Sequence, residues 1–223
     1  MDRMPTFYLN SYVPLVASKA GRDASARFNI LPFVDGSIRR EPDLEHEFPA
    51  ISCLCRADKF APRLKRGDIV GYMLNKERHG LDHAQRRLTA VLRVLDVLPN
   101  HTAGADWYVQ RDLPLPNNCW IHGNPPKALD HSHRRNRNKH LPAEQFHKNW
   151  DIEYRGRAMK HGTFVVCERL FVNLSWDAPE VAEPQLEAVF GHVPGTRNPG
   201  AWTITQAQHL LRLLQIGVLL SDR

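Results

Sequence analysis

The sequence lacks the short motifs that mark the commonest reaction sites. It has no glycine-rich phosphate-binding loop, no His-Glu-x-x-His zinc motif and no Gly-x-Ser-x-Gly nucleophile elbow. We therefore predict no catalytic residue, no bound metal and no cofactor from motifs alone. Any function must come from how less conspicuous residues are brought together by the fold.

Long apolar runs are also missing. No stretch approaches the roughly 20 apolar residues that a membrane-spanning helix needs, and Met1–Pro5 shows no signal-peptide core. We expect a cytoplasmic protein without membrane contact, in which the four cysteines stay reduced. Cys53 and Cys55 are separated by one residue, which is closer than the usual spacing of zinc ligands, so we interpret them as structural.

The chain carries an excess of positive charge. It has 223 residues, of which 42% are hydrophobic, a net charge of +6 and a pI of about 9.3. The hydrophobic fraction is enough for a core, and the charge favours an anionic partner, of which nucleic acid is the usual one. Simple solubility is the alternative explanation of the charge. No repeat or low-complexity linker divides the chain, which predicts one domain over residues 1–223.

Short segments rich in aromatic and β-branched residues predict a β-rich fold. The expected strands are residues 7–13, 27–34, 50–55, 69–74, 88–98 and 163–174, although residues 50–55 could equally begin a helix. Asp35-Gly36 is a strong turn signal. We expect loops at residues 14–26, 37–49, 75–87 and 100–125.

One helix is clearly predicted near the end of the chain. Thr203 to Gln206 and Thr205 to Gln208 both fit the capping-box spacing. The apolar residues that follow recur at helical spacing and should pack on the sheet: Ala207, Leu210, Leu211, Leu214 and Val218. The fold class expected is α+β, with a curved sheet or barrel, peripheral helices and this C-terminal helix. A barrel would leave few exposed strand edges.

Basic residues gather in a few places that could contact phosphates. Lys65 lies in the basic stretch before Gly67-Asp68, and residues 127–140 form a polar segment that contains Arg134, Arg135, Arg137 and Lys139. Such side chains bind the nucleic-acid backbone independently of its sequence. A solvated loop without a partner is the alternative interpretation of residues 127–140.

Aromatic residues within the expected turns are candidates for holding a base. A base taken out of its stack is usually held against an aromatic face and hydrogen-bonded at its edge. Trp120, His122 and Asn124 lie within five residues and offer a ring, an imidazole and an amide, and Trp107 and Trp150 are further candidates. The alternative is that these tryptophans fill the core beneath long loops.

An acidic cluster leaves room for an enzyme. Glu41, Asp43, Glu45, His46 and Glu47 could act as acid–base groups or hold a metal, although solvated loop charges are the default interpretation. The corresponding alternative function is a nuclease or a base-modifying hydrolase. A third alternative is a protein-interaction module.

Two stretches of the sequence resemble a known group of domains. Pro62 to Leu98, with the order basic turn, Gly67-Asp68, strand, loop and strand, resembles the PUA-like superfamily, which includes the ASCH, EVE and YTH readers. Leu170 to Pro179 and Gly191 to Arg197 resemble more closely the bacterial and phage nucleotide-modification-associated domains. Relative to those domains, the basic segment 127–140 is an insertion.

This resemblance implies a PUA-like domain that recognises a modified or flipped base. DNA is favoured over RNA as the partner, and a modification or restriction enzyme is implied as a protein partner. His192 and Arg197 correspond to loop residues that face the nucleotide. The leading hypothesis is therefore a non-catalytic nucleic-acid-binding domain.

Overall fold

The computed structural model describes residues 3–126, 141–195 and 199–220. Its strands are β1 (Phe7–Tyr12), β2 (Ala50–Ser52), β3 (Ile69–Leu74), β4 (Leu88–Leu98), β5 (Phe164–Val172) and β6 (Ala201–Trp202). Its α-helices are α1 (Lys19–Phe28), α2 (His101–Val109), α3 (Ala143–Lys160), α4 (Glu183–Phe190) and α5 (Ile204–Leu213). Short 3-10 helices are η1 (Leu15–Ala17), η2 (Ala57–Lys59) and η3 (Ala61–Arg63). Within these described ranges no helix has the length and apolarity needed to cross a bilayer.

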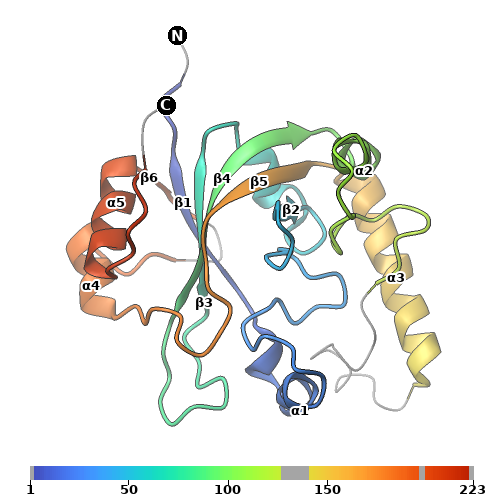
Figure 1. Cartoon of the computed structure of the whole chain (residues 1–223), viewed down its shortest axis with the longest axis horizontal. Coiled ribbons are helices and arrows are strands. Elements are labelled where there is room, and N and C mark those ends of the chain that lie inside the picture. The colour runs from blue at the N-terminus through green and yellow to red at the C-terminus, as the bar shows by residue number, and fades with distance from the viewer. Residues whose placement is uncertain (1–2, 127–140, 196–198, 221–223) are drawn as a thin grey trace.

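All six strands belong to one mixed sheet, in the order β2-β5-β4-β3-β1-β6. β1 runs parallel to β3, and every other neighbouring pair is antiparallel. The edge strands β2 and β6 are short and do not pair with each other, so the sheet stays open (Figure 1). The expected α+β class is confirmed. Of the curved sheet or barrel that we expected, the barrel is wrong, because the edge strands β2 and β6 do not pair to close the sheet.

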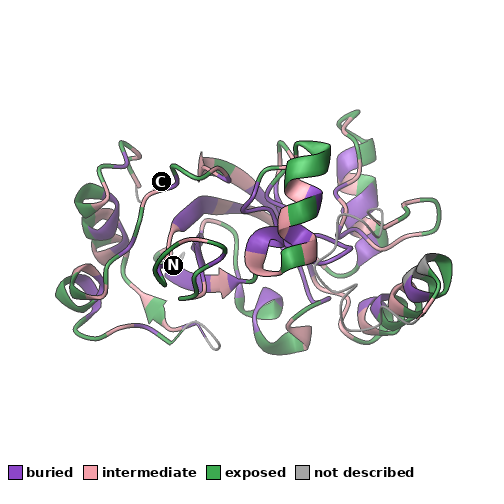
Figure 2. Cartoon of the chain, turned by 90° about the horizontal axis from the view of Figure 1, so that it is seen from below, coloured by how far each residue is buried: buried purple, intermediate pink, exposed green. Residues whose placement is uncertain are grey.

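Side chains alternate between the two faces of the sheet, as the pleat requires. On β1, Phe7 and Leu9 join the apolar cluster beneath α4 and α5, whereas Tyr8 and Tyr12 join the cluster on the opposite face. Helices α2 and α3 and the long connection that contains β2 lie on that second side (Figure 1). Figure 2 shows the buried residues concentrated along the sheet between these two layers.

The turn before β3 joins the starts of the two parallel strands. Gly67 adopts a φ of 87°, in the left-handed region that glycine tolerates. The buried Asp68 carboxylate accepts hydrogen bonds from the backbone N–H groups of Thr6 and Lys65, both at 2.9 Å, and pairs with Arg3. This turn therefore has a structural role that fixes the register between β1 and β3.

Most of the strand predictions are confirmed. β3 and β4 have the predicted bounds, β1 and β5 lie within the predicted segments, and β2 covers only the first half of residues 50–55. β4 carries two register shifts against β5, and such bulges bend a strand and increase its twist. The bent ends of β4 and β5 reach over β2 toward α2 (Figure 1).

The C-terminal helix is also confirmed. Thr203 Oγ1 accepts a hydrogen bond from the Gln206 backbone N–H, and Gln206 Oε1 accepts one from the Thr203 N–H, which completes the capping box. Ala207, Leu210 and Leu211 are buried against the sheet. Leu214 and Val218 are partly buried against the same cluster, although the helix itself ends at Leu213.

The prediction for residues 14–34 is wrong. The loop expected at 14–26 and the strand expected at 27–34 are replaced by η1 and α1. The Ser18 side chain caps α1 by accepting from the Gly21 N–H, and Asn29 ends it in the left-handed conformation. Only Gly21 and Ala24 are buried in α1, so the helix lacks the apolar stripe by which helices are recognised.

The turns expected around four aromatic residues are also wrong. Trp107 and Tyr108 lie in α2, and Trp150 and Tyr154 lie in α3. The inward side of α3 is a stripe at a spacing of four, formed by Phe146, Trp150, Tyr154 and Ala158. This spacing is typical of one helix face and was visible in the sequence.

Candidate functional site

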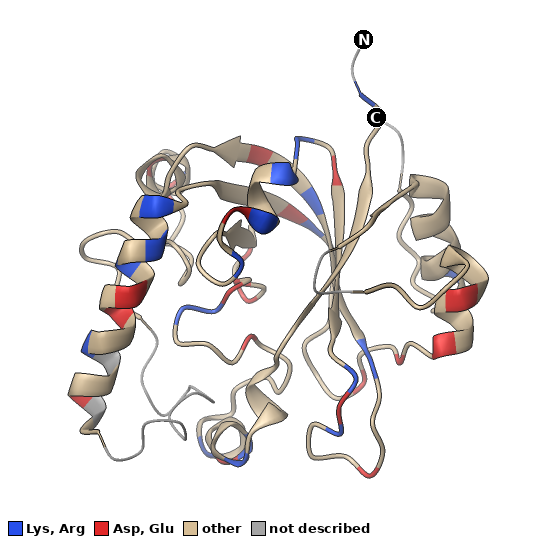
Figure 3. Cartoon of the chain, turned by 180° about the vertical axis from the view of Figure 1, so that it is seen from behind, with Lys and Arg blue, Asp and Glu red and all other residues tan. Residues whose placement is uncertain are grey.

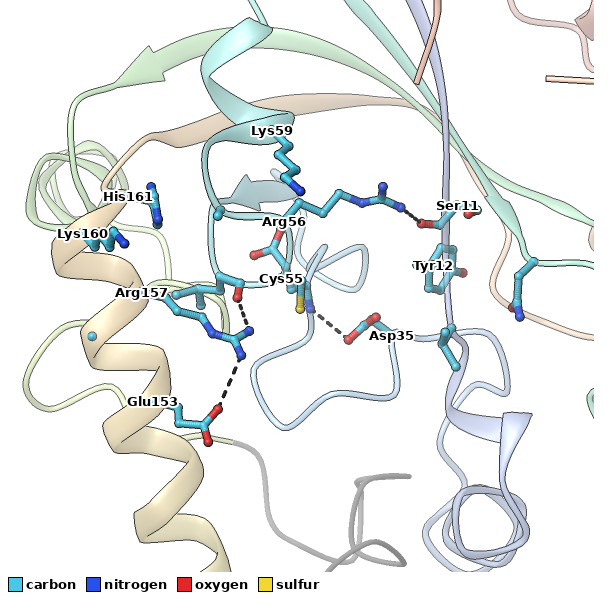
Figure 4. A pocket seen from close by; sticks show the side chains of 16 residues that line it. Ser11, Tyr12, Asp35, Cys55, Arg56, Lys59, Glu153, Arg157, Lys160 and His161 are labelled. Carbon is cyan, nitrogen blue, oxygen red and sulfur yellow. Dashed lines mark hydrogen bonds and ion pairs between the residues drawn. The ribbon is translucent and has the colours of Figure 1, made fainter. Parts of the chain in front are cut away.

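A large open hollow lies between α3, η2 and the end of β1 (Figure 4). Its volume is about 1040 Å³, which is at the upper end of the range of about 300–1,000 Å³ for ligand pockets. The residues lining it come from five separate segments of the chain, around positions 11–13, 35–41, 54–59, 75 and 153–161. The hollow is therefore a product of the tertiary fold.

The parallel pairing of β1 and β3 places one wall of the hollow. Both strands end at the same level, with Tyr12 opposite Leu74, and the Asn75 N–H donates to the Tyr12 carbonyl at 3.4 Å. Ser11, Tyr12 and Asn75 line the hollow from this side. Crevices beyond the carboxyl ends of parallel strands are common ligand sites.

Helix α3 forms the opposite wall and is attached by two arginine contacts. Arg157 donates to the Leu54 carbonyl at 2.8 Å, which joins the last turns of α3 to the loop after β2. The buried Arg39 guanidinium forms an ion pair with Asp151 and donates to the Asn124 carbonyl at 2.8 Å. The position of this wall thus depends on buried polar contacts.

Basic side chains line two sides of the hollow. Arg56 and Lys59 come from the loop and 3-10 helix after β2, while Arg157, Lys160 and His161 come from the end of α3. Figure 3 shows the basic residues of α3 and of the loop that faces it, and Figure 4 shows their side chains around one space. The two groups are about 100 positions apart in the sequence, so folding creates this concentration of charge.

Part of this basic group is paired with neighbouring acids, and part is not. Arg157 contacts Glu153 at 3.4 Å, and His161 lies 4.0 Å from Asp58. Lys59 and Lys160 are exposed and form no salt bridge with any residue of the described ranges. An anionic group at the mouth would find two lysines that are not already paired with carboxylates.

The floor of the hollow contains a buried glutamate. Glu41 is 7% exposed, and its carboxylate accepts hydrogen bonds from the Ser52 N–H at 2.8 Å, the Ser52 hydroxyl and Asn118 Nδ2 at 3.0 Å. Burial raises the pKa of Glu41 to about 7, and the nearby Asp35 raises it as well, against the lowering effect of these hydrogen bonds. This carboxyl group therefore changes its charge near neutral pH.

A second buried carboxyl group, Asp35, lines the same hollow. Its Oδ1 accepts from the backbone N–H groups of Ser37 and Glu41, at 2.8 and 3.0 Å, and from the Ser37 hydroxyl. Burial raises the pKa of Asp35 above its usual value, while these hydrogen bonds and the Arg40 charge lower it. Desolvated carboxyl groups in a hollow are typical of functional sites.

The segment that carries both carboxyl groups contradicts one prediction. Residues 37–49 were expected to form a solvated loop, yet residues 32–44 are buried throughout. The side chains of Arg39 and Arg40 have relative exposures of 1% each. Arg40 has a φ of 48° and donates to the Asp35 carbonyl at 2.6 Å. A buried loop with a left-handed arginine is costly, and such features often occur at functional sites.

Beneath the floor lies a much smaller space of about 20 Å³. It shares Ser11, Tyr12, Glu41, Cys55 and Arg56 with the large hollow. This volume is enough for about one water molecule. A ligand larger than a water molecule therefore cannot extend beyond the floor of the hollow.

The aromatic residues proposed for a base pocket lie elsewhere. Trp120 and Trp150 pack beside Phe146 and Tyr154 on the inner side of α3, and Trp120 Nε1 donates to Asp151 at 3.1 Å. Trp107 packs against Phe48 and lies 3.9 Å beneath the Arg111 guanidinium. The structure brings Trp120 and Trp150 together, but neither these two nor Trp107 lines the hollow.

His122 and Asn124 do not line the hollow either. Asn124 Nδ2 donates to the carbonyls of Pro116 and Cys119, at 2.9 and 2.7 Å, and its own carbonyl accepts from Arg39. His122 is exposed. Asn124 thus stabilises the loop beside α3.

The predicted phosphate contacts are dispersed or lie outside the described residues. Lys65 is exposed before β3, and His192 is exposed with its ring 5.5 Å from that of Trp202, beyond the opposite face of the sheet. Arg134, Arg135, Arg137, Lys139 and Arg197 lie outside the described residues. The structure therefore does not bring Lys65 and His192 to the hollow.

Sequence reasoning missed the residues that do converge. Arg56 and Lys59 lie in a short stretch after β2 that no motif marks. Arg157 and Lys160 lie in the last turn of α3, and His161 directly follows it, but this helix was not predicted. His46 and Glu47 were considered as acid–base groups, but neither lines the hollow, and His46 is hydrogen-bonded to the carbonyls of Phe48 and Pro114. Glu41, from the same acidic cluster, is the member that reaches the site.

Comparison with known proteins gives no guide to the function. No protein-family profile, no curated protein and no solved structure matches this chain significantly. The function therefore has to be argued from the hollow itself. Within the described ranges no group of three or more His, Cys, Asp or Glu side chains is arranged to hold a metal ion.

Proposed function

We propose that the protein is a PUA-like nucleic-acid-binding domain that holds one modified or flipped base in the hollow between α3 and β1. The observation that carries this proposal is the convergence of Arg56, Lys59, Arg157 and Lys160 around one space. Cations at the mouth of a pocket can hold the phosphates on either side of a base that enters it. DNA is the favoured partner, and a modification or restriction enzyme is the protein that we expect to act with this domain.

The dimensions of the site support this proposal. A volume of about 1040 Å³ accommodates a nucleoside with part of its backbone. The floor offers hydrogen-bonding groups from Asp35 and Glu41, Asn75 offers another on the β3 side, and the exposed lysines Lys59 and Lys160 lie at the mouth. A ligand that is polar at one end and anionic at the other fits this order of groups.

The test is a binding titration with charge-reversed variants. Fluorescence anisotropy with labelled single-stranded and duplex DNA and RNA should show binding whose affinity falls as salt rises. Lys59→Glu and Lys160→Glu should each weaken binding by about tenfold or more, because a phosphate contact is replaced by repulsion. Arg212→Glu, on α5 beyond the other face of the sheet, is the matched control and should bind as the wild type does.

Two outcomes would contradict the proposal. Absence of binding to every nucleic acid at low salt would rule out the function. A loss of binding in Lys65→Glu, with none in Lys59→Glu or Lys160→Glu, would instead move the interface to the basic turn before β3.

An enzyme that hydrolyses a nucleotide or nucleic acid is the second candidate. It is favoured by Glu41, whose pKa of about 7 suits a group that gives and takes protons at neutral pH. Incubation with nucleotides and oligonucleotides, followed by mass spectrometry, should then reveal a product that Glu41→Gln does not form. Lack of turnover, or equal turnover by Glu41→Gln, would exclude this role.

A further inference from the structure

The hollow is divided by charge from its mouth to its floor. Lys59 and Lys160 are exposed at the mouth, whereas Glu41 and Asp35, which are 7% and 6% exposed, lie at the floor. We propose that the floor of the hollow selects a base that presents an amino group. This inference rests on the proposed function, which assigns the phosphates to the mouth. The amino group would lie against Glu41 and Asp35, while the phosphates contact Lys59 and Lys160.

Glu41 lacks the cationic partner that a buried carboxylate usually has. Its three described hydrogen bonds come from neutral donors on Ser52 and Asn118, and no Lys, Arg or His of the described ranges forms a salt bridge with it. A buried charge without a partner is costly. An amino or ammonium group of a ligand would supply the missing positive partner or N–H donor.

The remaining capacity of the floor is for accepting hydrogen bonds. A carboxylate offers about four acceptor positions, and Glu41 uses three in the hydrogen bonds described above. Asn75 Oδ1, on the β3 side of the same hollow, is buried and accepts no hydrogen bond within the described residues. Its amide nitrogen already donates to Glu77 at 2.6 Å, which fixes the oxygen as the free group.

The nearby cations are directed to other acceptors. Arg40 pairs with Glu45 at 3.1 Å and donates to backbone carbonyls, and Arg56 donates to the Ser11 carbonyl at 2.7 Å. The other titratable groups that border the small space are Tyr12, Tyr72 and Cys55, and the Tyr12 hydroxyl donates to the Phe33 carbonyl. The floor is therefore rich in acceptors, and an acceptor-rich ligand edge, such as one with only carbonyl groups, would match it poorly.

Matched oligonucleotides test this selectivity in the wild-type protein. Each pair differs at one central position by a single amino group: guanine against hypoxanthine, adenine against unsubstituted purine, and 5-aminomethyluracil against thymine, which is 5-methyluracil. In at least one pair the amino-bearing strand should bind about tenfold or more tightly, because its loss leaves buried acceptors unpaired.

Two variants then locate the selectivity. Glu41→Gln, which replaces an acceptor oxygen by a donor, should remove the preference while salt-dependent binding to the phosphates remains. Glu187→Gln is the control, because Glu187 is exposed on α4, on the other side of the sheet, and it should keep the preference.

The outcomes separate this inference from the function on which it rests. Failure of every oligonucleotide to bind would overturn both the proposed function and the amino-group inference. Binding of equal strength within all three pairs would overturn the amino-group inference and leave nucleic-acid binding intact. Circular dichroism checks that Glu41→Gln is folded; if it is not, the comparison within the wild-type pairs still decides the question.

Discussion

The two faces of the sheet are stabilised by different kinds of interaction. On the α4 and α5 side, apolar residues such as Leu9, Met73 and Leu210 form a continuous cluster. On the α3 side, apolar clusters are interrupted by a buried loop with Arg39 and Glu41. The candidate site lies only on the second side, where the polar groups that stabilise the fold can also contact a ligand.

This difference can be tested first at the buried arginine that attaches α3. Arg39→Met should lower the free energy of unfolding by about 3–5 kcal/mol, because Asp151 loses its charged partner and keeps the hydrogen bond from Trp120, and two backbone carbonyls lose their donor. Chemical denaturation measures the change. Arg93→Met is the control, since its salt bridge with Glu168 is partly exposed, and it should cost less than about 1 kcal/mol. Equal effects of the two substitutions would mean that the buried contact is no stronger than a surface one.

The apolar side should respond to loss of volume. Leu210→Ala removes a buried side chain of α5 and should cost about 2–5 kcal/mol through the cavity it leaves. Leu213→Ala, in the same helix but 39% exposed, should cost much less. Binding of nucleic acid should be unchanged in both variants at temperatures where they are folded. A change in affinity would contradict the assignment of the site to the other face.

The polar side should also show a distinctive dependence of stability on pH. The pKa of Glu41 is raised from 4.5 to about 7 in the folded protein, so the folded state holds the proton more tightly than the unfolded chain. Its favourable contribution is complete below about pH 4.5 and is lost as the pH rises through 7. The loss should reach about 3 kcal/mol.

Glu41→Gln isolates this effect, because glutamine cannot ionise. The difference in unfolding free energy between wild type and Glu41→Gln, measured by denaturant titration at several pH values, should turn against the wild type from pH 4.5 to 8. The pKa of Asp35 is raised in the same direction. Because Asp35 is present in both proteins, its contribution to the pH dependence cancels, to a first approximation, in the difference between them. A difference that stays constant with pH would show that Glu41 ionises as an exposed glutamate does.

The smallest expected effect is at the cap of α5. Thr203→Ala should cost about 1 kcal/mol, because the Gln206 N–H loses the hydroxyl that caps the helix. Thr205→Ala tests the second capping box that the sequence allows, and it should change stability by no more than about 0.5 kcal/mol. Thermal unfolding distinguishes the two. A larger loss at Thr205 would place the start of the helix two residues later.

The elements on the two sides of the sheet also differ in how well the sequence predicted them. Five of the six strands and α5 were predictable because their apolar residues repeat at the period of the element, as in β4 and the stripe from Ala207 to Leu211. The two-residue strand β6 was not predicted. The buried loop was not, because its charges have the composition of a solvated loop and Asp151, the partner of Arg39, lies far along the chain. α3 was missed although its stripe from Phe146 to Ala158 carried a usable signal.

The candidate site shows the same limit more strongly. Local reasoning favoured residues that are close in sequence, such as Trp120 and Asn124, but the hollow is lined by five distant segments. The sequence pattern identified the acidic cluster 41–47. It did not indicate that Glu41 is the member that lines the hollow, because that depends on how each side chain is buried. The carboxyl group of Glu41 is enclosed by contacts with Ser52 and Asn118, which are 11 and 77 positions away, and no short pattern encodes such contacts.

The placement of β1 has a consequence for synthesis of the chain. One of its edges pairs with β3, but the other pairs with β6, where Phe7 lies opposite Trp202. During translation, that second edge stays open until Ala201 and Trp202 have left the ribosome. An unpaired apolar strand is a template for association with other chains, so slow synthesis of the segment between β1 and β6 should favour aggregation of the nascent protein over folding.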